Sequence, residues 1–241
     1  MAEESAGMDR VPEFLRGPIH EYAGLVRKLA GANARALTLF GAVVAGSFDP
    51  DRHVVRNVLV LGEVDLEVLK RLAEHGAKLG KQRISAPLIM TPEYIAESLD
   101  TFPLELLEIQ QQHVTLFGQD HFVELTFAES DLRLQCEREI KAILIGLRQG
   151  LLAAAGRDRI LGELEVDVAA GLLRTLRGML WLKGDKKPKP SAAVVDAVET
   201  VTDRKLHGLR TALDPTAEHS WPEFQRLYED VAALSVIVNA W

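Results

Sequence analysis

The sequence has very little cysteine and no long apolar run. Its single cysteine, Cys136, excludes an intramolecular disulfide framework and fits a reducing compartment. No stretch of about 18 apolar residues is present, so we expect no membrane-spanning helix. The N-terminal segment up to Gly7 is polar and acidic, unlike the basic start and apolar centre of a secretory signal peptide. These features predict a soluble cytoplasmic protein.

An excess of positive charge is also absent. Asp and Glu number 35 against 28 Lys and Arg, which gives a formal net charge of −7. This balance argues against general nucleic-acid binding, because such binding needs a basic footprint. Hydrophobic residues make up 47% of the 241 positions, enough to bury a substantial core in one large domain or two small ones.

The first half of the chain alternates helix and strand patterns. Residues 1–17 are interpreted as a flexible lead-in, and apolar side chains at helical spacing then predict a helix over Ile19–Ala30. Short apolar runs rich in β-branched residues predict buried strands. These strands are Arg35–Phe40, Val54–Leu61 and Ile84–Met90.

Two further helix starts are indicated by capping residues. Asp65 can cap a helix that runs through Leu79, and Thr91 followed by a proline is a strong start for a short helix. The segment Leu104–Phe117 is ambiguous. Its end, before Gly118, is typical of a strand, whereas its beginning fits either a helix or a strand.

The pattern becomes wholly helical after Glu129. A long amphipathic helix is predicted from Ser130, and a linker rich in Lys and Pro over Lys183–Pro190 separates two pairs of helices. The other predicted helices are Asp158–Leu182, Ser191–Leu213 and Trp221–Ala240. The sequence therefore predicts an α+β fold, with an α/β domain over 18–128 that contains a small mixed sheet and a C-terminal helical bundle over 129–241.

Two glycines bound a short loop after the first predicted strand. The loop is Phe40-Gly41-Ala42-Val43-Val44-Ala45-Gly46, and the second strand contains Val55-Arg56-Asn57-Val58-Leu59-Val60-Leu61. This arrangement resembles the nucleotidyltransferase superfamily, in which a Gly-Ser-x-x-x-Gly loop precedes a strand with two Asp residues separated by one position. The kanamycin- and streptomycin-modifying enzymes are similar in plan, with an α/β half joined to a helical half. The resemblance implies a nucleotidyltransferase-like sheet and a nucleotide-binding site at Gly41, Ala42, Gly46 and Ser47.

The carboxylates that this family uses are missing. Nucleotidyl transfer needs divalent metal to bridge the triphosphate, and Mg²⁺ is held by carboxylate oxygens. By the resemblance, the two Asp positions are occupied by Val55 and Asn57, and Ala42 replaces the loop serine. A third acid is lacking from Ile84–Met90. We therefore predict a catalytically inactive nucleotidyltransferase-like protein without a metal cofactor, which binds a nucleotide, a small ligand or a protein partner.

Two alternatives stay open. In the first, a divergent active enzyme holds Mg²⁺ with other carboxylates and transfers a nucleoside monophosphate to a small molecule or protein. The candidate carboxylates are Glu63, Asp65 and Glu108, with Asp49 and Asp51. The simpler interpretations are that Glu63 is solvated, Asp65 caps a helix and Glu108 is salt-bridged. Asp49 and Asp51 are more simply part of a surface turn. In the second alternative, the chain is an unrelated α/β-plus-helical interaction module.

Other features have plain structural interpretations. Cys136 is expected to be a buried side chain rather than a reactive thiol, and the histidines show no metal-ligand spacing. The run Val231–Val238 is apolar almost all round the expected helix, which makes it a candidate seam with a second subunit. Homo-oligomerisation through the C-terminal helices is therefore an open expectation.

Overall fold

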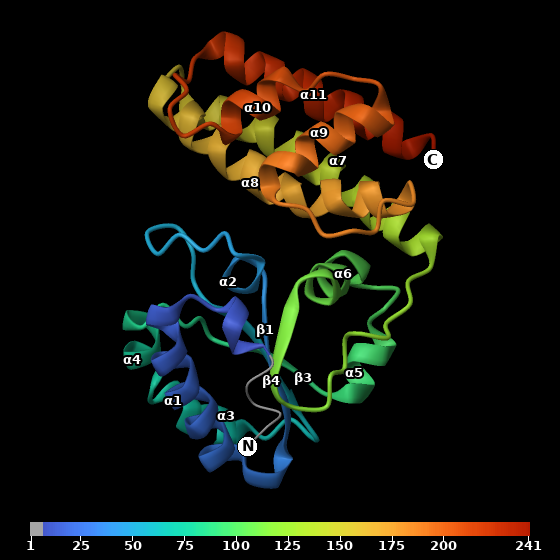
Figure 1. Ribbon diagram of the computed structural model, residues 1–241. Helices are drawn as coiled ribbons and strands as arrows, with labels where there is room; N and C mark the ends of the chain where they lie inside the picture. The colour runs from blue at the N-terminus through green and yellow to red at the C-terminus, as the bar shows by residue number, and fades with distance from the viewer. Residues whose placement is uncertain (1–6) are drawn as a thin grey trace. The chain divides into compact units, whose positions relative to one another are not determined.

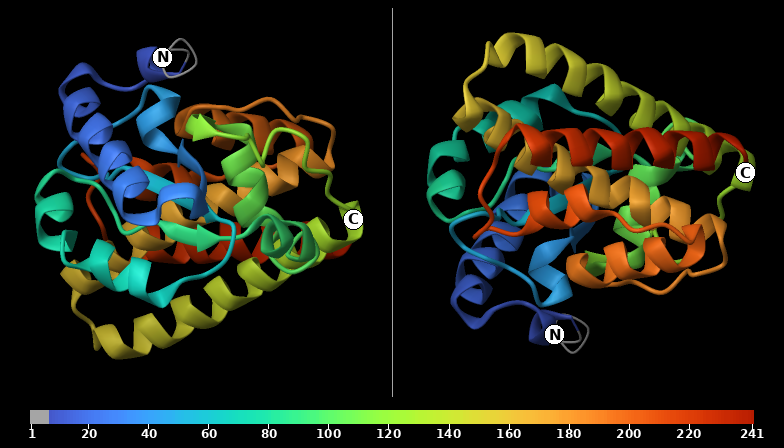
Figure 2. Two further views of the ribbon diagram at one scale, coloured as in Figure 1. Left: turned by 90° about the horizontal axis from the view of Figure 1, so that it is seen from below. Right: turned by 90° about the horizontal axis from the view of Figure 1, so that it is seen from above.

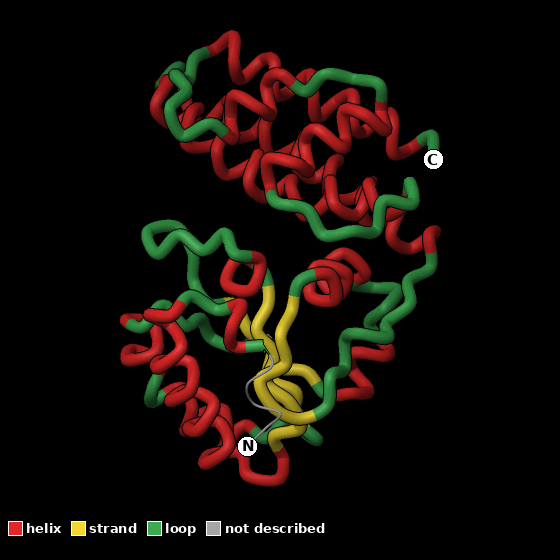
Figure 3. The backbone as a smooth tube through the Cα atoms, viewed as in Figure 1, coloured by secondary structure: helices red, strands yellow, loops and turns green. Residues whose placement is uncertain are grey.

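The computed structural model describes residues 7–241, which form two compact units. The first, called the α/β unit, comprises the chain up to Leu99 together with Leu106–Thr126. The second, called the helical unit, comprises Asp100–Glu105 together with Phe127–Trp241. All the strands of the described residues lie in the α/β unit, as Figure 3 shows. The observed architecture is the predicted α+β class, a small mixed sheet followed by a helical region.

The sheet has the strand order β3-β2-β1-β4. Its central strand β1 (Ala34–Phe40) pairs antiparallel with β2 (Arg56–Leu61) on one side and with β4 (His113–Gly118) on the other. The short strand β3 (Leu88–Met90) runs parallel to β2. The three strands predicted from apolar runs are therefore present, although the last covers only the end of Ile84–Met90.

Helices cover both faces of this sheet (Figure 1). One face carries α1 (Glu13–Ala30), α3 (Leu66–Ala73) and α4 (Gly76–Lys81), and the other carries α5 (Pro92–Glu97) and α6 (Pro103–Gln111). The α1 stripe of Leu15, Ile19, Tyr22 and Val26 packs against the inward side chains of β1 and β2 in one apolar core. Burial on both faces explains why the strands contain nearly continuous apolar runs.

The described part of the expected lead-in is structured. A 3-10 turn, η1 (Met8–Arg10), precedes α1, which begins at Glu13 rather than at Ile19. Val11 and Leu15 are buried in the core and extend the apolar stripe toward the N-terminus. Their burial outweighs the backbone hydrogen bond that Pro18 removes inside the helix. Residues 1–6 lie outside the described part of the chain.

Capping explains two helix starts, and both predictions are confirmed. The Asp65 carboxylate accepts a hydrogen bond of 2.8 Å from Glu67 N, and Thr91 Oγ1 accepts one of 3.1 Å from Tyr94 N. The helix predicted from Asp65 to Leu79 is broken, however. The chain turns after Ala73, and α4 starts at Gly76. The ambiguous segment divides into helix α6 and strand β4.

The helical unit contains the long helices α7 (Glu129–Ala154), α8 (Asp158–Leu182) and α11 (Trp221–Asn239), with α11 packed beside α7 (Figure 2). The single helix predicted over Ser191–Leu213 is two helices, α9 (Ser191–Thr202) and α10 (His207–Leu213). The residue that ends α9, Asp203, has a left-handed φ of 49°. None of the helices described for residues 7–241 is long and apolar enough to cross a membrane.

The C-terminal apolar run packs inside the helical unit. Val231, Leu234 and Val238 of α11 are fully buried, whereas Val236 is 72% exposed. The main buried stripe of this helix therefore contacts α7, α8 and α10 of the same chain. Cys136 is also buried as expected, and burial raises the pKa of its thiol to about 12.

Candidate functional site

The glycine loop joins β1 to β2 and contains one helical turn, α2 (Ala42–Ala45). Gly41 and Gly46 have φ angles of 78° and 74°, a left-handed region that side chains other than hydrogen disfavour. The two glycines therefore set the entry and exit of the turn, which explains their separation in the sequence.

Most backbone N–H groups of this loop are used inside the protein. Gly41 N donates to Gln112 O at 3.0 Å, and both Val44 N and Ala45 N donate to Gly41 O at 3.1 Å. Ser47 N donates to Ala42 O at 3.4 Å. An anion that approaches the loop meets few free amide donors, so a charged side chain is needed for strong binding.

The two positions that correspond to the family carboxylates are buried. Val55 and Asn57 are 0% and 1% exposed. Asn57 Oδ1 accepts a 2.8 Å hydrogen bond from the Tyr22 hydroxyl, and Asn57 Nδ2 donates to Ser85 O at 3.0 Å. Burial raises the pKa of Tyr22, so its hydroxyl keeps its proton and remains a donor. Val55 and Asn57 lie in the core on the face of the sheet that α1 covers. Neither side chain offers a negative charge to a metal.

The alternative carboxylates lie in different parts of the α/β unit. Glu63 and Asp65 follow β2, where Glu63 N bonds to Asn33 Oδ1 beside the start of β1. The seven residues of β1, about 20 Å of strand, separate that end of the sheet from Gly41. Asp49 accepts from Asp51 N within its own turn, at 2.9 Å. Over residues 7–241, no group of three or more His, Cys, Asp or Glu side chains is placed to hold a metal ion.

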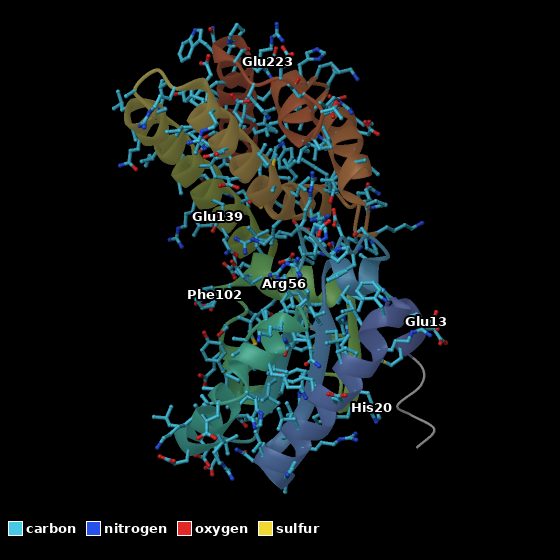
Figure 4. All side chains as sticks on the ribbon, turned by 90° about the vertical axis from the view of Figure 1, so that its left-hand side faces the viewer. Glu13, His20, Arg56, Phe102, Glu139 and Glu223 are labelled. Carbon is cyan, nitrogen blue, oxygen red and sulfur yellow. The ribbon has the colours of Figure 1, made fainter. Side chains whose placement is uncertain are left out.

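Glu108 is a candidate carboxylate on α6, and it pairs with Arg56 at the start of β2. Arg56, which Figure 4 labels, lies at the start of β2, and its Nη1 lies 2.7 Å from Oε1 of Glu108 on α6. Its guanidinium lies 4.4 Å from the centre of the Phe40 ring. A Cβ atom at Gly41 would lie 3.8 Å from the same Nη1. The Arg56 side chain is 44% exposed, so solvent and ligands reach it.

Arg56 was not singled out by the sequence analysis. It lies between Val55 and Asn57, and neighbouring residues of a strand face opposite sides of a sheet. This alternation alone would have indicated from the sequence that Arg56 and Asn57 lie on opposite faces of the sheet. Its contact with Phe40 follows from the register of β1 and β2, which pairs these two residues.

A histidine–carboxylate pair lies on the next strand along the same face. His113 opposes Phe40 in the register of β1 and β4. His113 Nε2 lies 2.8 Å from Asp120 Oδ2, and His113 Nδ1 faces the carbonyl oxygens of Ile109 and Gln110. Burial acts to raise the pKa of Asp120, but hydrogen bonds from Phe122 N and His113 outweigh it and lower that pKa. This pair fixes the start of β4 beside the site.

Comparisons with known proteins support the fold. No family model matches the chain, and no curated protein matches its sequence. Among solved structures, the crystal structure of spectinomycin adenyltransferase AAD(9) from Enterococcus faecialis, with ATP and spectinomycin, is similar with a TM-score of 0.58. The similarity covers 92% of this chain and 98% of that chain at 13% sequence identity. The chain therefore has a nucleotidyltransferase-like fold, as its glycine loop and strand order predicted.

Proposed function

We propose that this protein binds the phosphate groups of a nucleotide at the Arg56 end of the sheet, without a divalent metal and without transferring a nucleotidyl group. The observation that supports this proposal is the position of Arg56. Its guanidinium lies beside Gly41 and over Phe40, at the loop where the resemblance implies a nucleotide. The structurally similar spectinomycin adenyltransferase was solved with ATP.

The chemistry of the site supports the proposed absence of transfer. Nucleotidyl transfer requires metal to neutralise charge on the triphosphate and to activate the attacking oxygen. Valine has no ligand atom, and the Asn57 amide is already engaged with Tyr22 and Ser85. Glu63 and Asp65 lie at the other end of the strands, and no group of three or more His, Cys, Asp or Glu side chains within residues 7–241 is placed to hold a metal ion.

Arginine supplies what phosphate binding needs in the absence of metal. Its guanidinium is permanently charged and matches phosphate oxygens with two parallel N–H donors. Glu108, whose side chain is 17% exposed, holds the guanidinium in place through Nη1. The Phe40 ring packs against the face of the same guanidinium. The remaining donors of a half-exposed guanidinium are free to face a ligand.

The test is calorimetric titration of the full chain with ATP, GTP, CTP and UTP, each with Mg²⁺ and with EDTA. We expect at least one nucleotide to bind equally well in EDTA. Arg56→Gln should weaken that binding about 10- to 100-fold, the value of a charged hydrogen bond to phosphate. Arg52→Gln is the matched control, because Arg52 is an exposed arginine of the same connection that pairs with Asp49.

Two results would contradict the proposal. Binding that needs Mg²⁺ and is unaffected by Arg56→Gln would point to a metal site elsewhere. Release of pyrophosphate from ATP, measured with spectinomycin as a trial acceptor, would restore the active-enzyme alternative.

A further inference from the structure

The α/β unit contains an apolar cavity away from Arg56. A cavity of about 430 Å³ lies among α3, α4 and the segment that leads into β3. Its lining residues are all uncharged. They are Val54, Leu69, Leu72, Ala73, Gly76, Leu79, Gly80, Ile84, Ser85, Ala86, Pro87 and Ile89.

The break between α3 and α4 accounts for this cavity. A single helix from Asp65 to Leu79 was predicted, but the chain turns at Glu74 and His75, between α3 and α4. Leu72 and Leu79, on either side of the turn, are 7% exposed and form the inner wall with Ile84. Ala73, Gly76 and Gly80 are exposed at the rim, so the cavity opens to solvent.

Two glycines border open space at the rim of the cavity. Gly76 and Gly80 are one helical turn apart on α4 and both line the cavity. A Cβ atom added to either would have no heavy atom within 4 Å. No neighbouring side chain of the described residues therefore fills the room that these glycines leave.

The lining determines which ligands are compatible. Helices α3 and α4 carry Lys70, Arg71, Lys78 and Lys81, but none of these charges lines the cavity. An ion placed there would lose hydration without gaining a partner. The Ser85 hydroxyl donates its proton to Val55 O at 2.9 Å, so this hydroxyl is available to a ligand only as an acceptor.

We propose that this cavity is a binding site for a small uncharged apolar molecule, such as an aromatic or short acyl compound. Its volume lies within the range of about 300–1,000 Å³ that small-molecule pockets occupy. Apolar surface on both the helices and the β3 segment would be removed from water together. The inference does not depend on nucleotide binding, because it uses none of the residues around Arg56.

The test uses two dyes that differ mainly in charge. The probe is N-phenyl-1-naphthylamine, which is uncharged, and the comparison is 1-anilino-8-naphthalenesulfonate, which carries a sulfonate. We expect saturable fluorescence enhancement with the uncharged dye. The sulfonated dye should bind about tenfold more weakly or worse, since its charge must be desolvated. Equal binding of both dyes, or no binding of the uncharged dye, would overturn the proposal.

Cavity-filling variants locate the binding. Gly80→Leu places a side chain into the open space and should weaken the uncharged dye about tenfold or more. Ala77→Leu is the matched control, because Ala77 lies on the same helix, is exposed and does not line the cavity. Ala73→Phe fills the site from α3 and guards against a folding defect in one variant, with circular dichroism as the check. Wild-type dye binding by both filling variants would show that the dye binds elsewhere.

Discussion

Adjacent residues on β2 have opposite environments. Asn57 lies in the core below the sheet, where Tyr22 and Ser85 satisfy its amide. Arg56 lies on the other face with Glu108 and Phe40. These environments raise the question of whether a single substitution can restore one of the family carboxylates.

Asn57→Asp tests that question. The aspartate cannot donate to Ser85 O, and it introduces an uncompensated negative charge into a site that is 1% exposed. We expect the free energy of unfolding to fall by about 2–4 kcal/mol, with no gain of Mg²⁺-dependent transfer. Urea unfolding at pH 7 measures the change. Tyr22→Phe removes one hydrogen bond from the same amide and should cost about 1–2 kcal/mol. A stable, Mg²⁺-binding Asn57→Asp protein would contradict our account of the core.

Glu199 is a buried carboxylate in the helical unit. Its oxygens accept from Leu206 N, Lys205 Nζ and Arg210 Nε, each at 2.9 Å. The Arg210 hydrogen bond is the main reason that the pKa of Glu199 falls from 4.5 to about 2. A lowered folded-state pKa stabilises the fold above the unfolded pKa and loses that effect as pH falls. The contribution is therefore complete above about pH 4.5 and disappears toward pH 2.

Glu199→Gln should consequently lower the free energy of unfolding at pH 7, by the order of 2–3 kcal/mol. The difference from the wild type should shrink as the pH is lowered from 4.5 toward 2. Guanidinium unfolding at several pH values checks this. Glu229→Gln, at an exposed position on α11, is the control and should behave as the wild type. A difference that stays constant with pH would show that the carboxylate charge is not responsible.

Local signals at the residue scale were predictable because their partners are close in sequence. Asp65 and Thr91 cap helices that start within three residues of them. The partners of Arg56 come from elsewhere, since Glu108 is 52 positions away. Tyr22 and Asn57 are 35 positions apart. A single sequence does not reveal such pairs until the sheet register is known.

At the element scale, helices were located correctly but some of their breaks were missed. The breaks at Glu74–His75 and at Asp203 interrupt sequences whose apolar spacing continues past them. The spacing of apolar residues indicates which face of a helix is buried, but it does not reveal a short turn within the segment. Tertiary contacts made by the residues before and after the turn stabilise the break. The α8 bounds, by contrast, coincide with the predicted Asp158–Leu182.

The end of α7 gives a test of backbone conformation. Ala155 ends this helix with a φ of 49°, a left-handed conformation that costs alanine more than glycine. Ala155→Gly should therefore raise the free energy of unfolding by about 0.5–1 kcal/mol. Ala153→Gly, two residues earlier in the regular helix, should lower it by a similar amount. Thermal unfolding of both variants measures the signs. The same sign for the two changes would contradict the left-handed assignment.

At the scale of the whole molecule, the architecture is retained although sequence similarity is very low. The similar adenyltransferase covers 92% of this chain at 13% identity. The order of strands, glycine loop and helices was visible in the sequence because it depends on patterns of apolar residues and turns. The assignment of Asp100–Glu105 to the helical unit was not visible in the sequence, because this segment precedes the last strand of the α/β unit.

Helix α6 is consequently shared between the two units. Leu104 belongs to the helical unit and Leu107, one turn later, to the α/β unit. Both are buried. Leu104 N donates to Gln135 Oε1 at 2.7 Å, and its side chain and the Cys136 sulfur both lie within 3 Å of where a Cβ of Gly178 would stand. The two leucines thus support different cores from one helix.

Leu104→Ala and Leu107→Ala should each lower the free energy of unfolding by about 2–4 kcal/mol, since each leaves a cavity in a core. Their local effects should differ. Leu104→Ala should reduce hydrogen-exchange protection in α7 and α8 and speed the reaction of Cys136 with dithiobis-nitrobenzoate, because the thiol lies beside the new cavity. Leu107→Ala should instead reduce protection in the strands and leave the native thiol as unreactive as in the wild type. Equal thiol reactivity in the two variants would show that Leu104 does not support the helical core.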